Sequence, residues 1–208
     1  MHLRASCPRC PTGLATDLTC PTHGAVAAPL WRPETATYDA LAEHLSRAAD
    51  FPTYLPWPLP SGWSVVDFGV VHDAGVSRAT VSSVVGWTDE DGPIDLIVVS
   101  EEPGTGLGAR IAGTVHSDPG HEIAADRAMA RVRVESQAVP VWAIPTPEGG
   151  EGMERIVVAG EAAGRWLWLV LQPASAVMLL ARDIGLVDIS GLGAALLDAP
   201  FGGPGAHW

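Results

Sequence analysis

The spacing of hydrophobic residues changes along the chain and separates a short helical segment from a long strand-rich one. Residues 37–49 carry hydrophobic side chains at helical spacing, and Thr37 stands where a helix N-cap is expected. These hydrophobic residues are Tyr38, Leu41, Ala42 and Leu45. From Trp63 onward, hydrophobic and polar residues alternate, as in strands that bury one face. The pattern predicts one amphipathic helix followed by a sheet.

The alternating segment divides into several predicted strands. These are residues 63–72, 78–87, 94–100, 130–135, 139–144, 155–160 and 165–171. Residues 165–171 are apolar on both faces, which indicates a central strand. A second helix is predicted at 174–182, because Pro173 suits a first helical turn. We therefore expect an α+β domain with a mostly antiparallel sheet of six or seven strands and one or two covering helices, preceded by a small zinc ribbon.

The segments outside the sheet suggest how the chain is organised. Residues 51–62 contain four prolines, which exclude a regular helix or a central strand. They indicate an extended belt that Trp57 and Leu59 pin to the body. The expected organisation is a zinc ribbon at 1–30, a connector helix and belt at 31–62, the α+β domain at 63–200 and a frayed tail at 201–208.

Four potential metal ligands stand close to the N-terminus. The tetrapeptides CPRC (7–10) and CPTH (20–23) form two knuckles with two residues between the ligands. This spacing lets a tight turn aim both side chains at one ion while backbone amides donate to the thiolates. We therefore predict one structural zinc ion in a closed tetrahedral site of Cys7, Cys10, Cys20 and His23. A flexible tail and a redox CxxC pair are the alternatives, but a lone redox motif does not predict a second knuckle.

Charge and composition exclude several classes of protein. The 208 residues include 12 basic and 24 acidic side chains, and the net charge of -12 opposes non-specific binding to nucleic acid or anionic membranes. All the basic residues are arginines, so Walker phosphate loops, kinases and pyridoxal-phosphate enzymes, which need a lysine, are disfavoured. The N-terminus lacks the apolar region of a secretory signal, and no apolar run spans a bilayer. We expect a soluble cytoplasmic protein.

The loop after the predicted strand 94–100 offers alternative chemistry. Residues 101–110 formally match the dinucleotide fingerprint G-x-G-x-x-A, but nearby turn residues prevent the parallel strand–helix unit that the motif needs. We expect an ordered glycine loop with Arg110 paired to Glu101 or Glu102. The cluster of His116, Asp118, His121 and Glu122 follows and could ligate a second metal or supply acid–base groups, but a polar surface loop without such a function is the favoured interpretation.

Tryptophan is frequent, with eight residues in the chain. Trp166 and Trp168 share one face of a predicted strand, and Trp142 lies on a neighbouring one. These three side chains could line an apolar binding groove, but core packing is the default for large aromatic residues.

Several segments of the chain resemble a known family. They are CPRC with CPTHG, LPWPLPSGW (55–63), and EEPGTGLGARIAG (101–113) with GEAAGRWLWLVLQPASAVMLL (160–180). Together they resemble an uncharacterised actinobacterial family of similar length, with a zinc ribbon and a tryptophan-proline belt. The resemblance implies a domain of unknown function and transfers only the ribbon ligands. Some members carry a phosphotransacetylase label, but these residues show no acetyl-phosphate or coenzyme A chemistry.

Two functions follow from these observations. The first is a non-enzymatic adaptor, in which the ribbon and an aromatic surface of the sheet bind another protein. The alternative is an enzyme or small-molecule binder that uses the loops at 101–122, and convergence of Arg110, His116 and His121 on one pocket would favour it. Nucleic-acid contact through the mildly basic ribbon is disfavoured, because the acidic body would repel the phosphate backbone.

Overall fold

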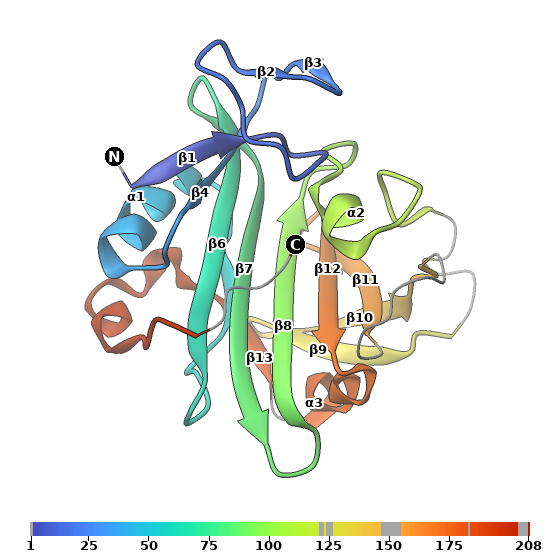
Figure 1. Cartoon of the computed structure of the whole chain (residues 1–208). Helices are drawn as coiled ribbons and strands as arrows, with labels where there is room; N and C mark the ends of the chain where they lie inside the picture. Colours follow the sequence, from blue (N-terminus) through green and yellow to red (C-terminus); the bar gives the residue numbers. More distant parts are fainter. Residues whose placement is uncertain (1, 121–122, 124–126, 147–154, 183, 204–207) are drawn as a thin grey trace.

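An eleven-stranded sheet forms the body of the molecule in the described part of the chain (Figure 1). The computed structural model describes residues 2–120, 123, 127–146, 155–182, 184–203 and 208. In spatial order the strands are β1 (Leu3–Ser6), β4 (Leu30–Pro33), β6 (Ser64–Asp73), β7 (Val76–Thr88), β8 (Gly92–Glu101), β12 (Arg165–Gln172), β11 (Ile156–Ala162), β10 (Gln137–Ala143), β9 (Ala130–Val134), β13 (Gly185–Asp188) and β5 (Tyr54–Pro56). Neighbouring strands are antiparallel, except for the parallel pair β9 and β13.

The α+β class and the mostly antiparallel sheet are confirmed, but the predicted number of six or seven strands is wrong. The additional strands are short and come from segments that the sequence assigned elsewhere. β1 and β4 belong to the predicted ribbon and connector, β5 belongs to the proline-rich belt, and β13 follows the predicted helix at 174–182. Strands of three or four residues carry too little alternation to be recognised, because backbone pairing with a distant segment defines them.

The sheet curls so that its edge strand β5 lies across β7. The hydroxyl of Ser82 in β7 donates to the carbonyl of Tyr54 in β5, and Thr80 donates to Pro52 beside it. Two hydrophobic clusters result, one on each face of the sheet. β12 contributes Leu169 to the first cluster and Trp168 to the second, and it pairs with β8 and β11. The predicted central position of this strand is therefore confirmed.

The helix α1 (Tyr38–Ala48) covers the first cluster and begins as predicted. The backbone N–H of Ala40 donates to Oγ1 of Thr37 at 3.3 Å, which confirms the N-cap. The buried face differs from the predicted one. Its residues are Ala40, Leu41, His44 and Ala48. Tyr38 and Ala42 are exposed, because the helix turns the polar His44 inward, where Nε2 contacts Thr53 Oγ1 at 2.9 Å.

The other helices are short. The predicted helix at 174–182 is a 3-10 turn, Ala174–Ala176, that continues into α3 (Val177–Arg182). The helix α2 (Leu107–Ala112) packs on the second cluster, and two further 3-10 turns are Ile189–Gly191 and Gly193–Asp198. In the described part of the chain, no helix is both long and apolar enough to cross a bilayer.

The last residue does not behave as the predicted frayed tail. Trp208 is partly buried and packs on the second cluster. The guanidinium carbon of Arg32 lies 4.0 Å from the centre of its ring, and that of Arg110 lies 5.6 Å away. The C-terminus therefore ends beside α2, in front of the sheet (Figure 1). Cation–π contacts and apolar burial together stabilise it there.

Candidate metal centre and the adjoining cavities

Two knuckles from the first strands bring the predicted metal ligands together. The first knuckle follows β1, and the backbone N–H of Cys7 donates to the carbonyl of Thr12 at 2.9 Å to close it. The second lies in the hairpin of β2 (Thr19–Cys20) and β3 (Gly24–Ala25). Gly24 has φ +70°, a conformation that side chains disfavour, and it ends this turn.

The four ligand atoms lie within 4.8 Å of one another. Nδ1 of His23 is 3.5 Å from Sγ of Cys7 and 3.6 Å from Sγ of Cys20. The sulfurs of Cys10 and Cys20 are 3.6 Å apart. Cys7 and Cys20 are buried, whereas His23 is exposed. One metal ion could be held by these three sulfurs and one nitrogen.

The polypeptide around the thiols provides groups that suit a metal-binding thiolate. Burial raises the pKa of the Cys7 thiol, although the backbone N–H of Arg9 donates to its sulfur and opposes this. Burial also acts on Cys10, but hydrogen bonds from the side chain and backbone of Thr12 outweigh it and lower the pKa of Cys10 to about 6. Donors aimed at sulfur are the usual outer partners of metal-bound cysteine.

Arg110 connects the first knuckle to the body of the protein. Its Nη1 donates to the carbonyl oxygen of Cys7 at 2.7 Å, across 103 positions of sequence. The expected pairing of Arg110 with Glu101 or Glu102 is therefore wrong. Glu102 instead pairs with Arg78 at 3.3 Å, and Glu101 is buried below the loop. A local pairing was the natural expectation from sequence, because the ribbon's position relative to α2 depends on tertiary packing.

Glu101 binds the amides at the start of α2. Its Oε2 accepts hydrogen bonds from the backbone N–H groups of Leu107 and Gly108, at 2.8 and 3.1 Å. Its Oε1 accepts one from Nε1 of Trp168 at 2.7 Å. Burial raises the pKa of Glu101 to about 7, against these donors, which lower it. The protein's own carboxyl group thus occupies the amides that a phosphate would need.

The dinucleotide fingerprint also fails on topology, as predicted. β8, which precedes the glycine loop, pairs antiparallel with both β7 and β12. A dinucleotide site needs parallel neighbours. The glycines serve packing instead, because a Cβ on Gly108 would overlap the indole ring of Trp168.

Two cavities adjoin the knuckles and share the glycine loop. The first, of about 360 Å³, lies between both knuckles and the loop, and Arg9, His23, Arg78 and Thr105 are among its lining residues. The second is also about 360 Å³, and Arg9, Arg110 and His116 are among its lining residues. Two of the predicted ligand-binding residues, Arg110 and His116, therefore meet at one cavity. His121 and Glu122 lie outside the described residues.

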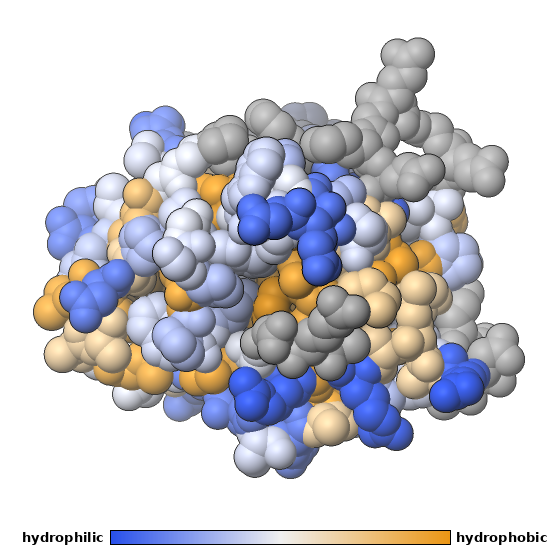
Figure 2. Space-filling view, turned by 90° about the horizontal axis from the view of Figure 1, so that it is seen from below, coloured by the Kyte–Doolittle hydropathy of each residue, from blue (hydrophilic) through white to orange (hydrophobic). Residues whose placement is uncertain are grey.

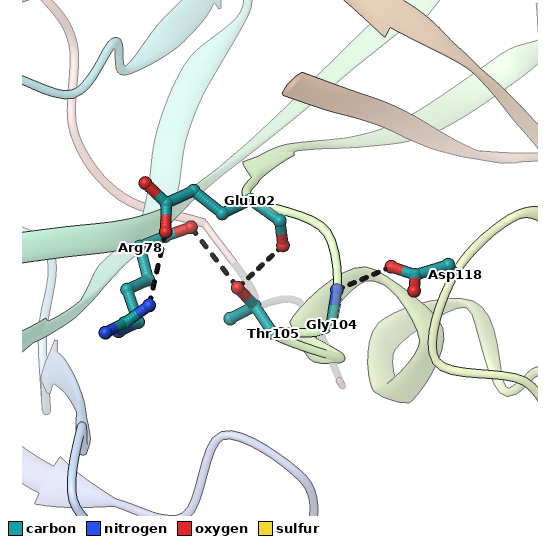
Figure 3. Close-up of polar contacts among 5 residues, drawn as sticks. All are labelled: Arg78, Glu102, Gly104, Thr105 and Asp118. Carbon is teal, nitrogen blue, oxygen red and sulfur yellow. Dashed lines mark hydrogen bonds and ion pairs between the residues drawn. The ribbon is translucent and has the colours of Figure 1, made fainter. Parts of the chain in front are cut away.

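Polar contacts fix the loop that separates the cavities (Figure 3). Oδ1 of Asp118 accepts the backbone N–H of Gly104 at 2.8 Å. Oγ1 of Thr105 donates to the carbonyl oxygens of Glu102, at 2.8 Å, and Arg78, at 3.4 Å. Asp118 therefore has a structural contact within the loop, and Glu102 has one beside it. These contacts agree with the interpretation of this segment as a polar loop.

The chain matches one protein family along nearly its whole length. A family model described as "Family of unknown function (DUF6758)" matches residues 1–207. The chain belongs to this family. No curated protein matches it, and no solved structure does.

The tryptophans of this family member mostly pack inside the protein. Trp168 is fully buried and Trp166 packs against the second cluster, so the core interpretation is confirmed for Trp168. All eight tryptophans lie in the described part of the chain, and Trp87 alone is exposed, at 62%. Seen from below, hydrophobic areas alternate with polar ones (Figure 2). The side chain of Trp168 is therefore not available to line the groove that the sequence suggested.

Proposed function

We propose that the protein is a non-enzymatic, cytoplasmic adaptor in which one structural zinc ion holds the ribbon in a fixed position. The ligand distances support zinc. With Zn–S bonds of ~2.3 Å and a Zn–N bond of ~2.0 Å, a tetrahedron has edges of roughly 3.8 Å between sulfurs and roughly 3.5 Å between sulfur and nitrogen. The corresponding distances are 3.6 Å for Cys10–Cys20, and 3.5 and 3.6 Å for the sulfurs nearest His23.

The donor set supports a structural role for the ion. Four protein ligands fill a tetrahedral zinc ion, so no position is left for a water or a substrate. Such a site contributes folding free energy and does not activate water. This argues for a binding module in place of a zinc hydrolase.

The observation that carries the proposal is the hydrogen bond from Arg110 to the carbonyl of Cys7. This hydrogen bond holds the first knuckle on α2, and a metal ion bound by both knuckles would hold the second knuckle to the first. The two knuckles would then form one surface with a fixed position on the body of the protein. The exposed parts of that surface are Arg9 in the first knuckle and residues 21–23 in the second. They lie at one end of the molecule, away from α3 (Figure 1). A partner protein would dock on these knuckles.

The test combines native mass spectrometry with affinity capture from the source cells. We expect one zinc per chain and a reproducible partner. Thr22→Arg, at an exposed position between two ligands, should retain zinc but lose the partner. Arg131→Ala, on the exposed side of β9, is the matched control and should retain both. A partner that binds Thr22→Arg equally well would rule out the knuckle surface.

A second candidate is a small-molecule binder or enzyme at the 101–122 loops. The observation in its favour is that Arg110 and His116 line one cavity. Native mass spectrometry of the same preparation discriminates the two functions, because a retained small molecule without a protein partner would favour this candidate.

A further inference from the structure

The two cavities beside the knuckles differ in charge from the rest of the molecule. The chain has 24 acidic and 12 basic residues. The residues that line the two cavities nevertheless include Arg9, Arg78 and Arg110 and neither aspartate nor glutamate. Arg9 lines both cavities, so it stands between them. A positively lined hollow in an acidic protein attracts anions and repels cations.

The nearby acidic side chains are already engaged. Glu102 pairs with Arg78 at 3.3 Å, and Asp118 accepts the N–H of Gly104 (Figure 3). Glu101 faces the amides of α2 and is fully buried. Glu102 therefore offsets the charge of Arg78, whereas Asp118 keeps its negative charge beside Gly104. Arg9 and Arg110 are the wall arginines that form no ion pair among the described residues.

The arginines differ in what they still offer a ligand. Arg9 is exposed and forms no ion pair among the described residues. Arg110 uses Nη1 for the carbonyl of Cys7, while its Nε is buried without a hydrogen-bond partner. Arg78 is partly neutralised by Glu102. Arg9 is thus the primary anion-binding group, and Ser117 adds a hydroxyl to the second cavity.

We propose that this pair of cavities binds a small organic anion through its carboxylate or phosphate group, with Arg9 as the main contact. The planar guanidinium fork matches both groups with two parallel hydrogen bonds. Each cavity, at about 360 Å³, falls within the usual size of a small-molecule site, which is roughly 300–1,000 Å³. The inference names the ligand class of the second candidate function and rests on it; it is independent of the adaptor proposal.

The experiment is an NMR titration of the zinc-loaded full chain with inorganic phosphate, with succinate and with sodium chloride at matched ionic strength. We expect phosphate or succinate to shift the amide signals of Gly104, Thr105 and Gly106 saturably. The stronger of the two identifies the recognised group. Chloride should have little effect, because screening alone does not produce a local saturable shift.

Two variants and a control decide whether the cavities are responsible. Arg9→Ala should weaken anion binding at least tenfold while one zinc per chain is retained. Val115→Glu places a negative charge on an exposed wall residue of the second cavity, away from the zinc ligands, and should also weaken binding. Arg131→Ala removes an exposed charge elsewhere and should leave affinity unchanged. If Arg9→Ala loses zinc, Val115→Glu alone tests the proposal.

The proposal is overturned if phosphate and succinate act no more strongly than chloride, or if the variants bind as the wild type does. If the protein retains a neutral molecule and binds neither anion, the proposal of an anion site is wrong, but the second candidate function stands. If the chain retains no small molecule and binds neither anion, both fall.

Discussion

Nε1 of Trp168 donates a hydrogen bond of 2.7 Å to Oε1 of Glu101, across 67 positions of sequence. The same carboxyl group accepts the amides of Leu107 and Gly108. One fully buried glutamate therefore joins β8, β12 and the start of α2. Because α2 carries Arg110, this buried cluster sets the direction from which the guanidinium reaches the first knuckle.

Gly108→Ala should be strongly destabilising. The added methyl group would overlap the indole ring of Trp168, which is fully buried. We expect a loss of about 3 kcal/mol in the free energy of unfolding, measured by urea denaturation. Gly191→Ala is the matched control, because nothing lies within 4 Å of the added atom. Equal stability of the two variants would refute the close packing.

Arg110→Ala should release the ribbon without removing its metal. The lost hydrogen bond to Cys7 involves a charged donor, and such bonds contribute about 1.5–3 kcal/mol. Hydrogen exchange at residues 7–13 should accelerate, while zinc remains at one per chain. Arg131→Ala should leave the exchange unchanged. Protection of the first knuckle equal to that of the wild type would show that Arg110 does not hold it.

Cys10→Ala should abolish stoichiometric metal binding, because three ligands cannot close the tetrahedral site. Binding of a structural metal is also folding free energy, so residues 3–30 should lose hydrogen-exchange protection. Zinc quantitation by mass spectrometry provides the measurement. His116→Ala should keep the metal, since His116 lies outside the ligand cluster. Retained zinc in Cys10→Ala would disprove the assignment.

Two buried groups should make stability depend on pH in opposite directions. Burial lowers the pKa of His44 to about 3 from its ordinary 6.5, so below pH 6.5 the unfolded chain takes up a proton that the folded one refuses. Burial raises the pKa of Glu101 from 4.5 to about 7, so the folded chain retains a proton that the unfolded one releases. The first effect lowers stability as pH falls and the second lowers it as pH rises.

Between pH 4.5 and 6.5 the two effects oppose each other, at about 1.4 kcal/mol per pH unit each. Glu101→Gln should therefore unmask His44, and the free energy of unfolding should fall more steeply with acidification than in the wild type. Urea denaturation at about pH 5.0, 5.5, 6.0 and 6.5 measures how the free energy of unfolding changes with pH. Glu161→Gln, at an exposed position on β11, is the control. If the free energy of unfolding changes with pH in the same way in the wild type and both variants, Glu101 does not offset the effect of His44.

Local signals explain which features the sequence could predict. The grouping of Cys7, Cys10, Cys20 and His23 follows from two short spacings, and the start of α1 follows from Thr37. Both features depend on residues close together in the chain, so a single sequence is sufficient to predict them.

Features that depend on distant segments were missed. The pairing of Leu3 with Pro33, which makes β1 a strand, has no local pattern. The contact of Arg110 with Cys7 and that of Trp168 with Glu101 join segments whose relative placement only the folded sheet determines. Hydrophobic periodicity reports which face of an element is buried, but not which neighbour it meets.

The pairing of β4 with β6 has a practical consequence for dividing this protein into fragments. A fragment that starts at residue 34 would keep most of the hydrophobic core but lose β4, and so leave β6 without its partner at Val70 and Val71. Unpaired backbone groups at the edge of a strand invite pairing between molecules. The first thirty-three residues therefore cover part of this edge, and a shortened chain would need another segment there to limit aggregation.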